Sequence, residues 1–310
     1  MFSDHVLTLL APGQGSQTPG MLTEWLTDAE AADRIAAWSE ATGLDLTALG
    51  TTATAEEITD TAVTQPLVVV SALLSYAQLR ARHGRIPADT VVAGHSVGEL
   101  AAAAISGVIT DDEAVRLAAI RGAEMAKACA LVPTTMAAVL GGDETEVLAR
   151  LAEYELVPAN RNAAGQIVAA GSVDGVDQLI ASPPEKARIR KLAVAGAFHT
   201  NFMAPAQEAV AAAAAQITPR DPQFTLLSNS DGLPVTSGAD ALNKLVNQVT
   251  SPVRWDLCSQ YLREHETDAI IELAPGGTLV GIAKRELKGV PARAVKVPGD
   301  LDELPLPVLG

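Results

Sequence analysis

The chain has 310 residues, which is enough for one large domain or two, and its composition is 48% hydrophobic but 3% aromatic. A core of this composition consists mainly of Ala, Val, Leu and Ile, which is typical of α/β proteins with covered sheets. The formal net charge of −15 argues against nonspecific binding to nucleic acid or to an anionic membrane.

Targeting and metal-binding patterns are missing from the sequence. Residues 1–12 contain an apolar run without a basic region or a cleavage pattern, and no uninterrupted apolar stretch is long enough to span a bilayer. Cys129 and Cys258 lie far apart in helical patterns, without C-x-x-C spacing or a matching histidine cluster. We therefore expect a cytoplasmic protein with two buried thiols, no membrane segment and no metal.

The first predicted strand, residues 6–10, leads into the loop Ala11-Pro12-Gly13-Gln14-Gly15-Ser16-Gln17. This loop lacks both G-x-G-x-x-G and the G-K-[ST] ending of a phosphate loop, which argues against nucleotide binding. A loop at the carboxyl edge of a parallel sheet can instead supply a backbone N–H to an oxyanion. The alternative is a plain turn. Farther along, Thr64-Gln65-Pro66 predicts the start of an amphipathic helix that runs to residue 82, with Pro66 in its first turn.

Residues 90–100 predict a buried strand, a tight turn at Ser96 and a helix over residues 97–105. Gly94, Ser96 and Gly98 form G-x-S-x-G, in which small residues let strand and helix approach while the bent backbone exposes the serine hydroxyl. This context favours a nucleophile elbow over an ordinary strand-to-helix turn.

The next predicted helix begins with the capping box Thr110-Asp111-Asp112-Glu113. One face of it carries a guanidinium within an apolar stripe, formed by Ala114, Leu117, Ala118, Arg121 and Met125. A buried Arg needs an anion, which leaves two alternatives: a structural pair with Glu124, or a bidentate pair with a substrate carboxylate.

Short alternating elements follow, with strands predicted over residues 136–140, 167–170 and 188–194 and a helix over residues 144–153. They indicate a small α+β insertion with an antiparallel sheet. His199 comes next, after two small residues and before a helix over residues 205–216. Among the five histidines it is the candidate general base, because His5 is terminal, His83 closes a helix, His265 lies among charges, and His95 should point its ring away from Ser96. Later elements are strands over residues 224–228 and 269–273 and helices over residues 242–250 and 279–287.

Several motifs occur in a fixed order: Pro12-Gly13-Gln14-Gly15-Ser16-Gln17, Gly94-His95-Ser96-Val97-Gly98-Glu99, Arg121-Gly122, Gly196-Ala197-Phe198-His199, and Gln248 before Pro252-Val253-Arg254-Trp255. In order and spacing, over nearly the whole chain, they resemble the malonyl-CoA:acyl carrier protein transacylases of type II fatty acid synthesis. The resemblance implies ping-pong transfer without a cofactor. The serine matching Ser96 attacks malonyl-CoA, and the phosphopantetheine thiol of the carrier protein then takes the malonyl group.

The same resemblance implies roles for individual residues. His199 matches the general base, which a backbone carbonyl at the position of Gln248 orients. The backbone N–H groups of Gln14 and Val97 match the oxyanion hole, and Arg121 matches the arginine that holds the malonyl carboxylate. Substrate-lining positions are matched by Phe198, His95, Gln65 and Asn162. Phe198 resembles the bulky residue of malonyl-selective members, where methylmalonyl-selective relatives carry Ser.

The fold implied is an α/β-hydrolase-like parallel-sheet core, residues 1–132 and 198–310, with a smaller ferredoxin-like subdomain, residues 133–197. We expect a monomer whose partners are malonyl-CoA and acyl carrier protein, without nucleic acid or membrane. The candidate patch for an acidic partner, which can equally be a set of solvated faces, comprises Lys186, Arg188, Arg190, Lys191, Lys284 and Arg285.

Two other functions fit part of the pattern. A serine hydrolase of lipase, esterase or patatin-like type could use Asp231 in a Ser-Asp dyad, and it would differ in admitting water to the acyl-enzyme. The second alternative is a non-catalytic module that docks carrier protein. The presence of Ser96, His199 and Arg121 together argues against this alternative.

Overall fold

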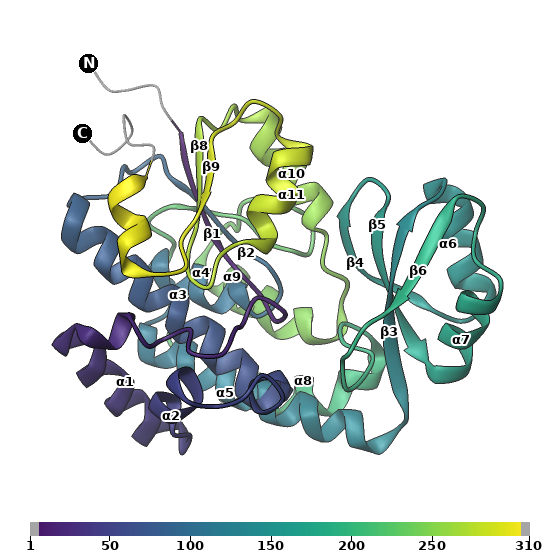
Figure 1. The fold of residues 1–310 in the computed structure, drawn as a ribbon, viewed down its shortest axis with the longest axis horizontal. Helices are drawn as coiled ribbons and strands as arrows, with labels where there is room; N and C mark the ends of the chain where they lie inside the picture. Colours follow the sequence, from purple (N-terminus) through teal and green to yellow (C-terminus); the bar gives the residue numbers. More distant parts are fainter. Residues whose placement is uncertain (1–5, 305–310) are drawn as a thin grey trace.

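The computed structural model describes residues 6–304, which form a larger body around one sheet and a smaller body around another (Figure 1). The larger sheet has five strands in the order β7-β2-β1-β8-β9, and all neighbours are parallel. The smaller has four antiparallel strands in the order β4-β5-β3-β6. The mixed α/β class predicted from the sequence is confirmed. The strands are β1 (Leu7–Ala11), β2 (Val91–Gly94), β3 (Thr134–Gly141), β4 (Val157–Ala163), β5 (Gln166–Ser172), β6 (Ala187–Lys191), β7 (Thr225–Leu226), β8 (Ala269–Glu272) and β9 (Ala292–Ala294).

Helices pack against both sheets. They are α1 (Ala29–Thr42), α2 (Leu46–Thr51), α3 (Thr61–His83), α4 (Gly98–Ile105), α5 (Asp111–Leu131), α6 (Glu144–Glu153), α7 (Val173–Ala181), α8 (Ala204–Ala214), α9 (Gly238–Asn247), α10 (Trp255–Glu264) and α11 (Thr278–Glu286). Short 3₁₀ helices cover Trp25–Thr27, Glu57–Thr59, Asn201–Met203, Gln248–Thr250 and Pro298–Glu303.

Both faces of the parallel sheet are covered, which explains the continuous apolar strands in the sequence. On β1, Leu7 and Leu9 face the core that contains α3, α4 and α5, whereas Leu10 faces the core that contains α10 and α11. All three side chains are buried. The sheet is therefore the central layer of the larger body.

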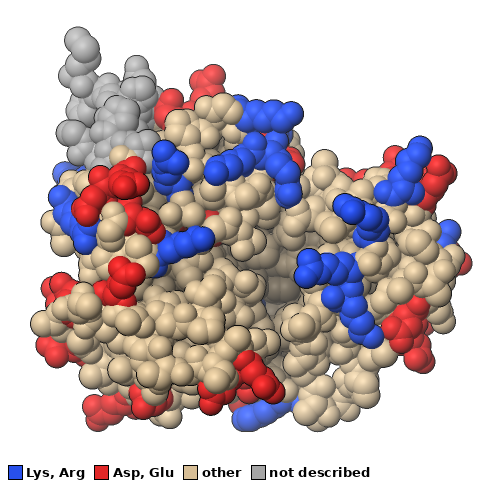
Figure 2. All heavy atoms as spheres, viewed as in Figure 1, with Lys and Arg blue, Asp and Glu red and all other residues tan. Residues whose placement is uncertain are grey.

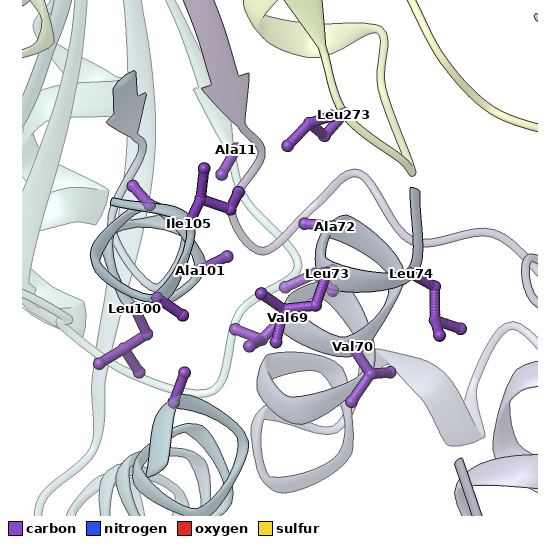
Figure 3. Close-up of a cluster of buried hydrophobic side chains, with 14 of the residues drawn as sticks. Ala11, Val69, Val70, Ala72, Leu73, Leu74, Leu100, Ala101, Ile105 and Leu273 are labelled. Carbon is purple, nitrogen blue, oxygen red and sulfur yellow. The ribbon is translucent and has the colours of Figure 1, made fainter. Parts of the chain in front are cut away.

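Figure 3 shows the part of the larger core that lies between α3 and α4. Leu73 and Val69 of α3 lie toward Ala101 of α4, and Leu273, after β8, lies near the end of β1. Small side chains on α4 allow close packing, and all eight residues of this helix are buried. This packing fixes the helix that follows Ser96.

Helix α3 begins one turn earlier than expected. The side chain of Asp60 accepts a hydrogen bond from the N–H of Ala62 and caps the helix at Thr61, so Pro66 lies inside the helix and its expected place in the first turn was wrong. By length and composition α3 could cross a membrane, but 72% of its apolar window is buried inside the protein. Burial among α4 and α5 accounts for its apolar character.

The small antiparallel sheet was predicted with incomplete detail. Helix α6 has the predicted bounds, but β4 and α7 were not predicted, and β6 ends at Lys191 rather than at residue 194. Strand β4 reads Val-Pro-Ala-Asn-Arg-Asn-Ala and its pairing with β5 contains register shifts, so no alternation of apolar residues marks it. The sheet occupies one unbroken segment between α5 and α8.

Candidate active site

Ser96 stands on a tight turn between β2 and α4. Its φ of 53° is a left-handed value that a residue with a side chain rarely adopts. A Cβ atom on Gly94 would collide with the backbone of Gly98, and one on Gly98 would collide with the carbonyl oxygen of Ala11. Glycine is therefore required on both sides of the serine, as the elbow interpretation predicts.

His199 lies directly against the serine. Its Nε2 is 2.8 Å from Oγ of Ser96, and its Nδ1 is 2.8 Å from the backbone oxygen of Gln248. Because a carbonyl only accepts, Nδ1 carries the proton and Nε2 is free to accept the serine proton. Burial, reinforced by the Arg121 charge, lowers the pKa of His199 to about 3. The ring is therefore a neutral base at ordinary pH.

Arg121 of α5 reaches the same point. Its Nη2 lies 3.3 Å from Oγ of Ser96 and donates to Oε1 of Gln248 at 3.0 Å, while Nη1 donates to Oε1 of Gln65 at 2.6 Å. Burial lowers its pKa to about 10, so the guanidinium remains charged. Glu124 instead pairs with Lys127. The alternative of a structural Arg121–Glu124 pair is wrong, because Glu124 turns to the surface while Arg121 faces inward.

One nitrogen of this guanidinium is unsatisfied. Nε of Arg121 is buried without a hydrogen-bond partner in the described part of the chain. Its other partners are neutral oxygens of amides and a hydroxyl, so no anion is bonded to the cation. An unpaired buried charge of this kind is suited to a carboxylate ligand.

Two backbone N–H groups near the serine are available for an oxyanion. Gln14 follows β1 and Val97 follows Ser96, and neither N–H donates a hydrogen bond to another residue within 6–304. The side chain of Gln14 donates to Oγ1 of Thr61 at 3.1 Å. Preorganised N–H donors are what stabilise a tetrahedral intermediate.

A cavity of about 200 Å³ opens beside the serine, between the larger body and the antiparallel sheet. Nε2 of His95 lies 2.8 Å from Oδ1 of Asn162, and its ring meets Trp255 edge-on, so His95 is engaged away from the serine hydroxyl. The larger body and the small sheet both contribute to the lining, which includes Gln14, Gln65, His95, Ser96, Arg121, Met125, Met136, Asn162, Phe198 and His199.

Glu99 and Asn229 belong to the site and were not predicted to do so. Glu99, the second residue of α4, accepts hydrogen bonds from the backbone N–H of Asn229 at 2.6 Å and from Nε2 of Gln248. Oδ1 of Asn229 accepts from the N–H of Ser96 at 2.8 Å. The motif Gly98-Glu99 was one available signal, because an acidic residue in an alanine-rich buried helix needs a polar partner.

Asp231, the acid of the alternative Ser-Asp dyad, is bound elsewhere. Its carboxylate pairs with Lys244 at 3.0 Å and accepts from the N–H of Leu233, whereas the serine hydroxyl is bonded to His199 and Arg121. The geometry therefore gives no support to the dyad. Residues 6–304 hold no cluster of three or more metal-ligating side chains.

Comparison with known proteins agrees with this geometry. A family model described as the acyl transferase domain matches residues 8–301. The malonyl CoA-acyl carrier protein transacylase of Mycobacterium tuberculosis (strain ATCC 25618 / H37Rv) is 66% identical over 299 residues, which are 96% of this chain and 99% of the relative. The chain belongs to the malonyl CoA-acyl carrier protein transacylase family.

More distant members of the transacylase family align over the same length. The transacylase of Escherichia coli (strain K12) is 33% identical over 294 residues, covering 93% of this chain and 94% of the relative. The crystal structure of the Mycobacterium tuberculosis transacylase has a TM-score of 0.93 at 65% identity, covering 96% and 99% of the two chains. A malonyl-transacylase solved in complex with a type II PKS acyl-carrier protein has a TM-score of 0.86 at 30% identity, covering 96% of this chain and 98% of that chain.

Neither cysteine of this transacylase lines the cavity beside Ser96, although Sγ of Cys258 accepts a hydrogen bond from Nδ2 of Asn229 at 3.9 Å. Cys258 is buried, as predicted, whereas the prediction for Cys129 was wrong, because this residue near the end of α5 is only half-buried. Burial raises the pKa of both thiols, that of Cys129 to about 11. Neither is suited to act as a nucleophile in place of Ser96.

Proposed function

We propose that this transacylase moves a malonyl group from coenzyme A to the phosphopantetheine thiol of an acyl carrier protein through a malonyl ester on Ser96. The observation that carries the proposal is the double contact of Oγ of Ser96, 2.8 Å from Nε2 of His199 and 3.3 Å from Nη2 of Arg121. A nucleophile, a neutral base and an unpaired cation share one cavity, which is what transfer of a charged acyl group needs.

In the first half-reaction His199 Nε2 takes the proton of Ser96, and Oγ bonds to the thioester carbon of malonyl-CoA. The negative charge that develops on the thioester oxygen is held by the N–H groups of Gln14 and Val97. Loss of one such donor typically costs about 3 to 4 kcal/mol of transition-state stabilisation. The carbon–sulfur bond then breaks, and the departing sulfur takes the proton from His199.

The second half-reaction repeats these steps with the pantetheine thiol. His199 takes the thiol proton, the sulfur bonds to the ester carbon, and the bond to Ser96 breaks as its oxygen recovers a proton. The neutral form of His199 is needed at the start of both half-reactions. Its lowered pKa supports this role, because the ring stays unprotonated far below neutral pH.

Arg121 selects the acyl group in this proposal. A malonyl carboxylate pairs with the guanidinium, whereas a neutral acyl group would leave a buried charge unpaired, at a cost of roughly 2 to 5 kcal/mol. Gln65 holds the opposite side of the guanidinium and fixes its direction. His95, Asn162 and Phe198 complete the cavity wall on which the acyl group would lie.

Carrier protein is proposed to dock on the basic rim, which comprises Lys186, Arg188, Arg190, Lys191, Lys284 and Arg285. Figure 2 shows basic side chains gathered on both sides of the hollow between the two bodies. All six residues are exposed. In the described chain Lys186 and Lys191 pair with acidic neighbours, whereas no ion pair within 4 Å involves Arg188, Arg190 or Lys284. An acidic partner would meet these free cations first.

The basic rim is tested by loading malonyl-enzyme onto carrier protein at increasing salt. Arg188→Ala with Arg190→Ala should raise the KM for carrier protein several-fold and leave formation of malonyl-enzyme unchanged. Arg116→Ala, an exposed residue of α5 outside the rim, is the control. An unchanged KM in the double variant would remove β6 from the docking surface.

Further expectations from the sequence stand as proposals. We assign the core, residues 1–132 and 198–310, to an α/β-hydrolase-like fold and residues 133–197 to a ferredoxin-like subdomain. We also propose that the protein is a cytoplasmic monomer without a membrane segment. The burial of α3 inside the protein supports the absence of a membrane segment. Sedimentation of the purified protein tests the monomer.

The decisive experiment is intact-mass measurement after mixing with malonyl-CoA. The proposal predicts a malonyl adduct on the wild type, no adduct on Ser96→Ala, and transfer of the adduct to holo-carrier protein. Release of free malonate as fast as carrier protein is loaded would identify a hydrolase instead. Absence of any adduct on the wild type would favour a docking module.

A further inference from the structure

Glu99 is a buried carboxylate that the proposed chemistry does not use. It is 5% exposed and lies three residues after Ser96. Its two oxygens accept hydrogen bonds from different donors, Oε1 from the N–H of Asn229 and Oε2 from Nε2 of Gln248. Within residues 6–304 no basic nitrogen lies within 4 Å of it, so an ion pair does not explain its burial.

Both partners of Glu99 hold catalytic groups. Asn229 accepts the N–H of Ser96 on its Oδ1 at 2.8 Å and donates from Nδ2 to the oxygen of Gly94 at 2.8 Å, which fixes both sides of the elbow. Gln248 supplies the backbone oxygen that faces Nδ1 of His199 at 2.8 Å. One carboxylate on α4 therefore holds the supports of both the nucleophile and the base.

We propose that Glu99 is a positioning residue for acyl transfer, whose carboxylate ties Asn229 to Gln248 and so holds Ser96 in register with His199. This inference rests on the proposed function. Glu99 does not touch the cavity that would receive the substrate, so it acts through its two partners.

The donors around Glu99 require a carboxylate. A Gln side chain has one accepting oxygen, so its NH₂ group would face one of the two N–H donors. The orientation of Gln248 depends on the same arrangement. Its Nε2 faces Glu99 and its Oε1 faces Nη2 of Arg121 at 3.0 Å. Nε2 of Gln248 also donates to the backbone oxygen of Ser96 and to Oδ1 of Asn229, each at 3.1 Å. Loss of the carboxylate therefore removes one of three acceptors that keep this amide from turning over.

The surroundings of Glu99 determine its titration. Burial raises its pKa to about 8, while the Asn229 N–H and the charges of Arg121 on α5 and Lys244 on α9 act in the opposite direction. The negative charge of Asp231 raises the pKa of Glu99, as burial does. Burial raises the pKa of the Cys258 thiol on α10 far above this range. His199 titrates at about 3. Of these groups only Glu99 has a pKa near 8, so a change in the acylation rate near pH 8 is assigned to the titration of Glu99.

The test is single-turnover acylation of the purified enzyme by malonyl-CoA and, separately, by acetyl-CoA. Glu99→Gln should lower the saturating rate at pH 9 at least tenfold for both donors, with half-saturating concentrations within threefold of the wild type. The wild-type rate should rise through about pH 8. The acylation rate of Glu99→Gln should not rise over this range, so the rates of the two enzymes should approach each other as the pH is lowered toward 6.5. Glu99→Asp, which keeps the charge, should recover part of the rate at pH 9.

Glu113→Gln is the matched control. Its carboxylate also accepts a backbone N–H, that of Thr110 at 2.7 Å, and it lies eight residues before Arg121, about 12 Å along α5. It should lower the melting temperature without a tenfold loss of rate. Rates are expressed per folded enzyme, with melting followed by circular dichroism.

Three results would overturn the positioning role. The first is a Glu99→Gln rate per folded enzyme equal to the wild type. The second is a change confined to the half-saturating concentration of malonyl-CoA. The third, decisive if Glu99→Gln does not fold, is a wild-type acylation rate that stays flat from pH 6.5 to 9.5. If wild-type enzyme forms no malonyl adduct, the proposed function fails instead, so the two failures are distinct.

Discussion

Nη2 of Arg121 lies 3.3 Å from Oγ of Ser96, so the cation contacts the nucleophile itself. Arg121 belongs to α5 and Ser96 to the turn that precedes the neighbouring helix α4, and the packing of these two helices sets the distance. A guanidinium here favours negative charge on the serine oxygen and opposes positive charge on His199. It also explains the lowered pKa of that histidine beyond the effect of burial.

The first prediction concerns acyl selectivity. Arg121→Ala should lower kcat/KM for malonyl-CoA by more than about 100-fold, because loss of one partner of a buried ion pair costs about 3 to 5 kcal/mol. The ratio of acetyl to malonyl transfer should rise, since a neutral acyl group gains from removal of the unpaired charge. Arg116→Ala, on the exposed face of α5, is the control. An unchanged acyl preference would return Arg121 to a structural role.

A second prediction concerns the side chain before the base. Phe198 is 7% exposed and lines the cavity, so Phe198→Ser opens space there. Room for one methyl group is worth about 1 to 3 kcal/mol, which predicts a gain of 10-fold or more in the methylmalonyl-to-malonyl ratio. Competition between the two donors, read by adduct mass, measures it. Phe202→Ser, at a 40% exposed position, should leave the ratio unchanged.

Acid stability provides the third prediction. The pKa of His199 is lowered to about 3 in the folded protein from 6.5, so between these values the unfolded chain binds a proton that the folded one does not. The contribution of His199 to stability is therefore complete above about pH 6.5 and is lost as pH falls toward 3, by about 1.4 kcal/mol per pH unit. His199→Asn should reduce this slope by one proton. Urea unfolding at several pH values from 4 to 7 measures it, and equal slopes would contradict the lowered pKa.

The sequence predicted this site where local signals coincided. Gly94, Ser96 and Gly98 could be recognised because the steric demands of a tight strand-to-helix turn are local. The inward face of Arg121 followed from helical spacing, since Ala118 and Met125 on the same stripe are also buried. The proposed domain division at residues 133 and 197 rests on the short alternating strands and helices predicted between these residues, and it stays a proposal.

Other parts could not be read from the sequence, for physical reasons. The bond between Glu99 and Asn229 joins positions 130 residues apart, and nothing in either local pattern names the partner. The start of α3 depended on an Asp60 cap rather than on Pro66. Strand β4 carries two buried polar residues, Asn160 and Asn162, which line the cavity. Polar residues at buried positions do not produce the apolar pattern by which a strand is predicted.

The last prediction separates steric from conformational effects of glycine. At Gly98 a Cβ would collide with the carbonyl oxygen of Ala11, which belongs to the backbone of β1 and cannot rotate away. Gly98→Ala should therefore destabilise the protein by about 1 to 3 kcal/mol, the usual range for overpacking, and should lower acylation by displacing Ser96. Gly281 of α11 meets nothing within 4 Å, so Gly281→Ala adds no contact.

Because alanine favours a helix over glycine, Gly281→Ala should stabilise the protein by about 0.5 to 1 kcal/mol and leave acylation unchanged. Urea unfolding and single-turnover acylation of both variants provide the comparison. If Gly98→Ala matched Gly281→Ala in both measurements, close approach of β1 and α4 would not be what holds Ser96 in its left-handed conformation. A loss of rate in Gly98→Ala without loss of stability would instead show that the elbow shifts at little cost to the fold.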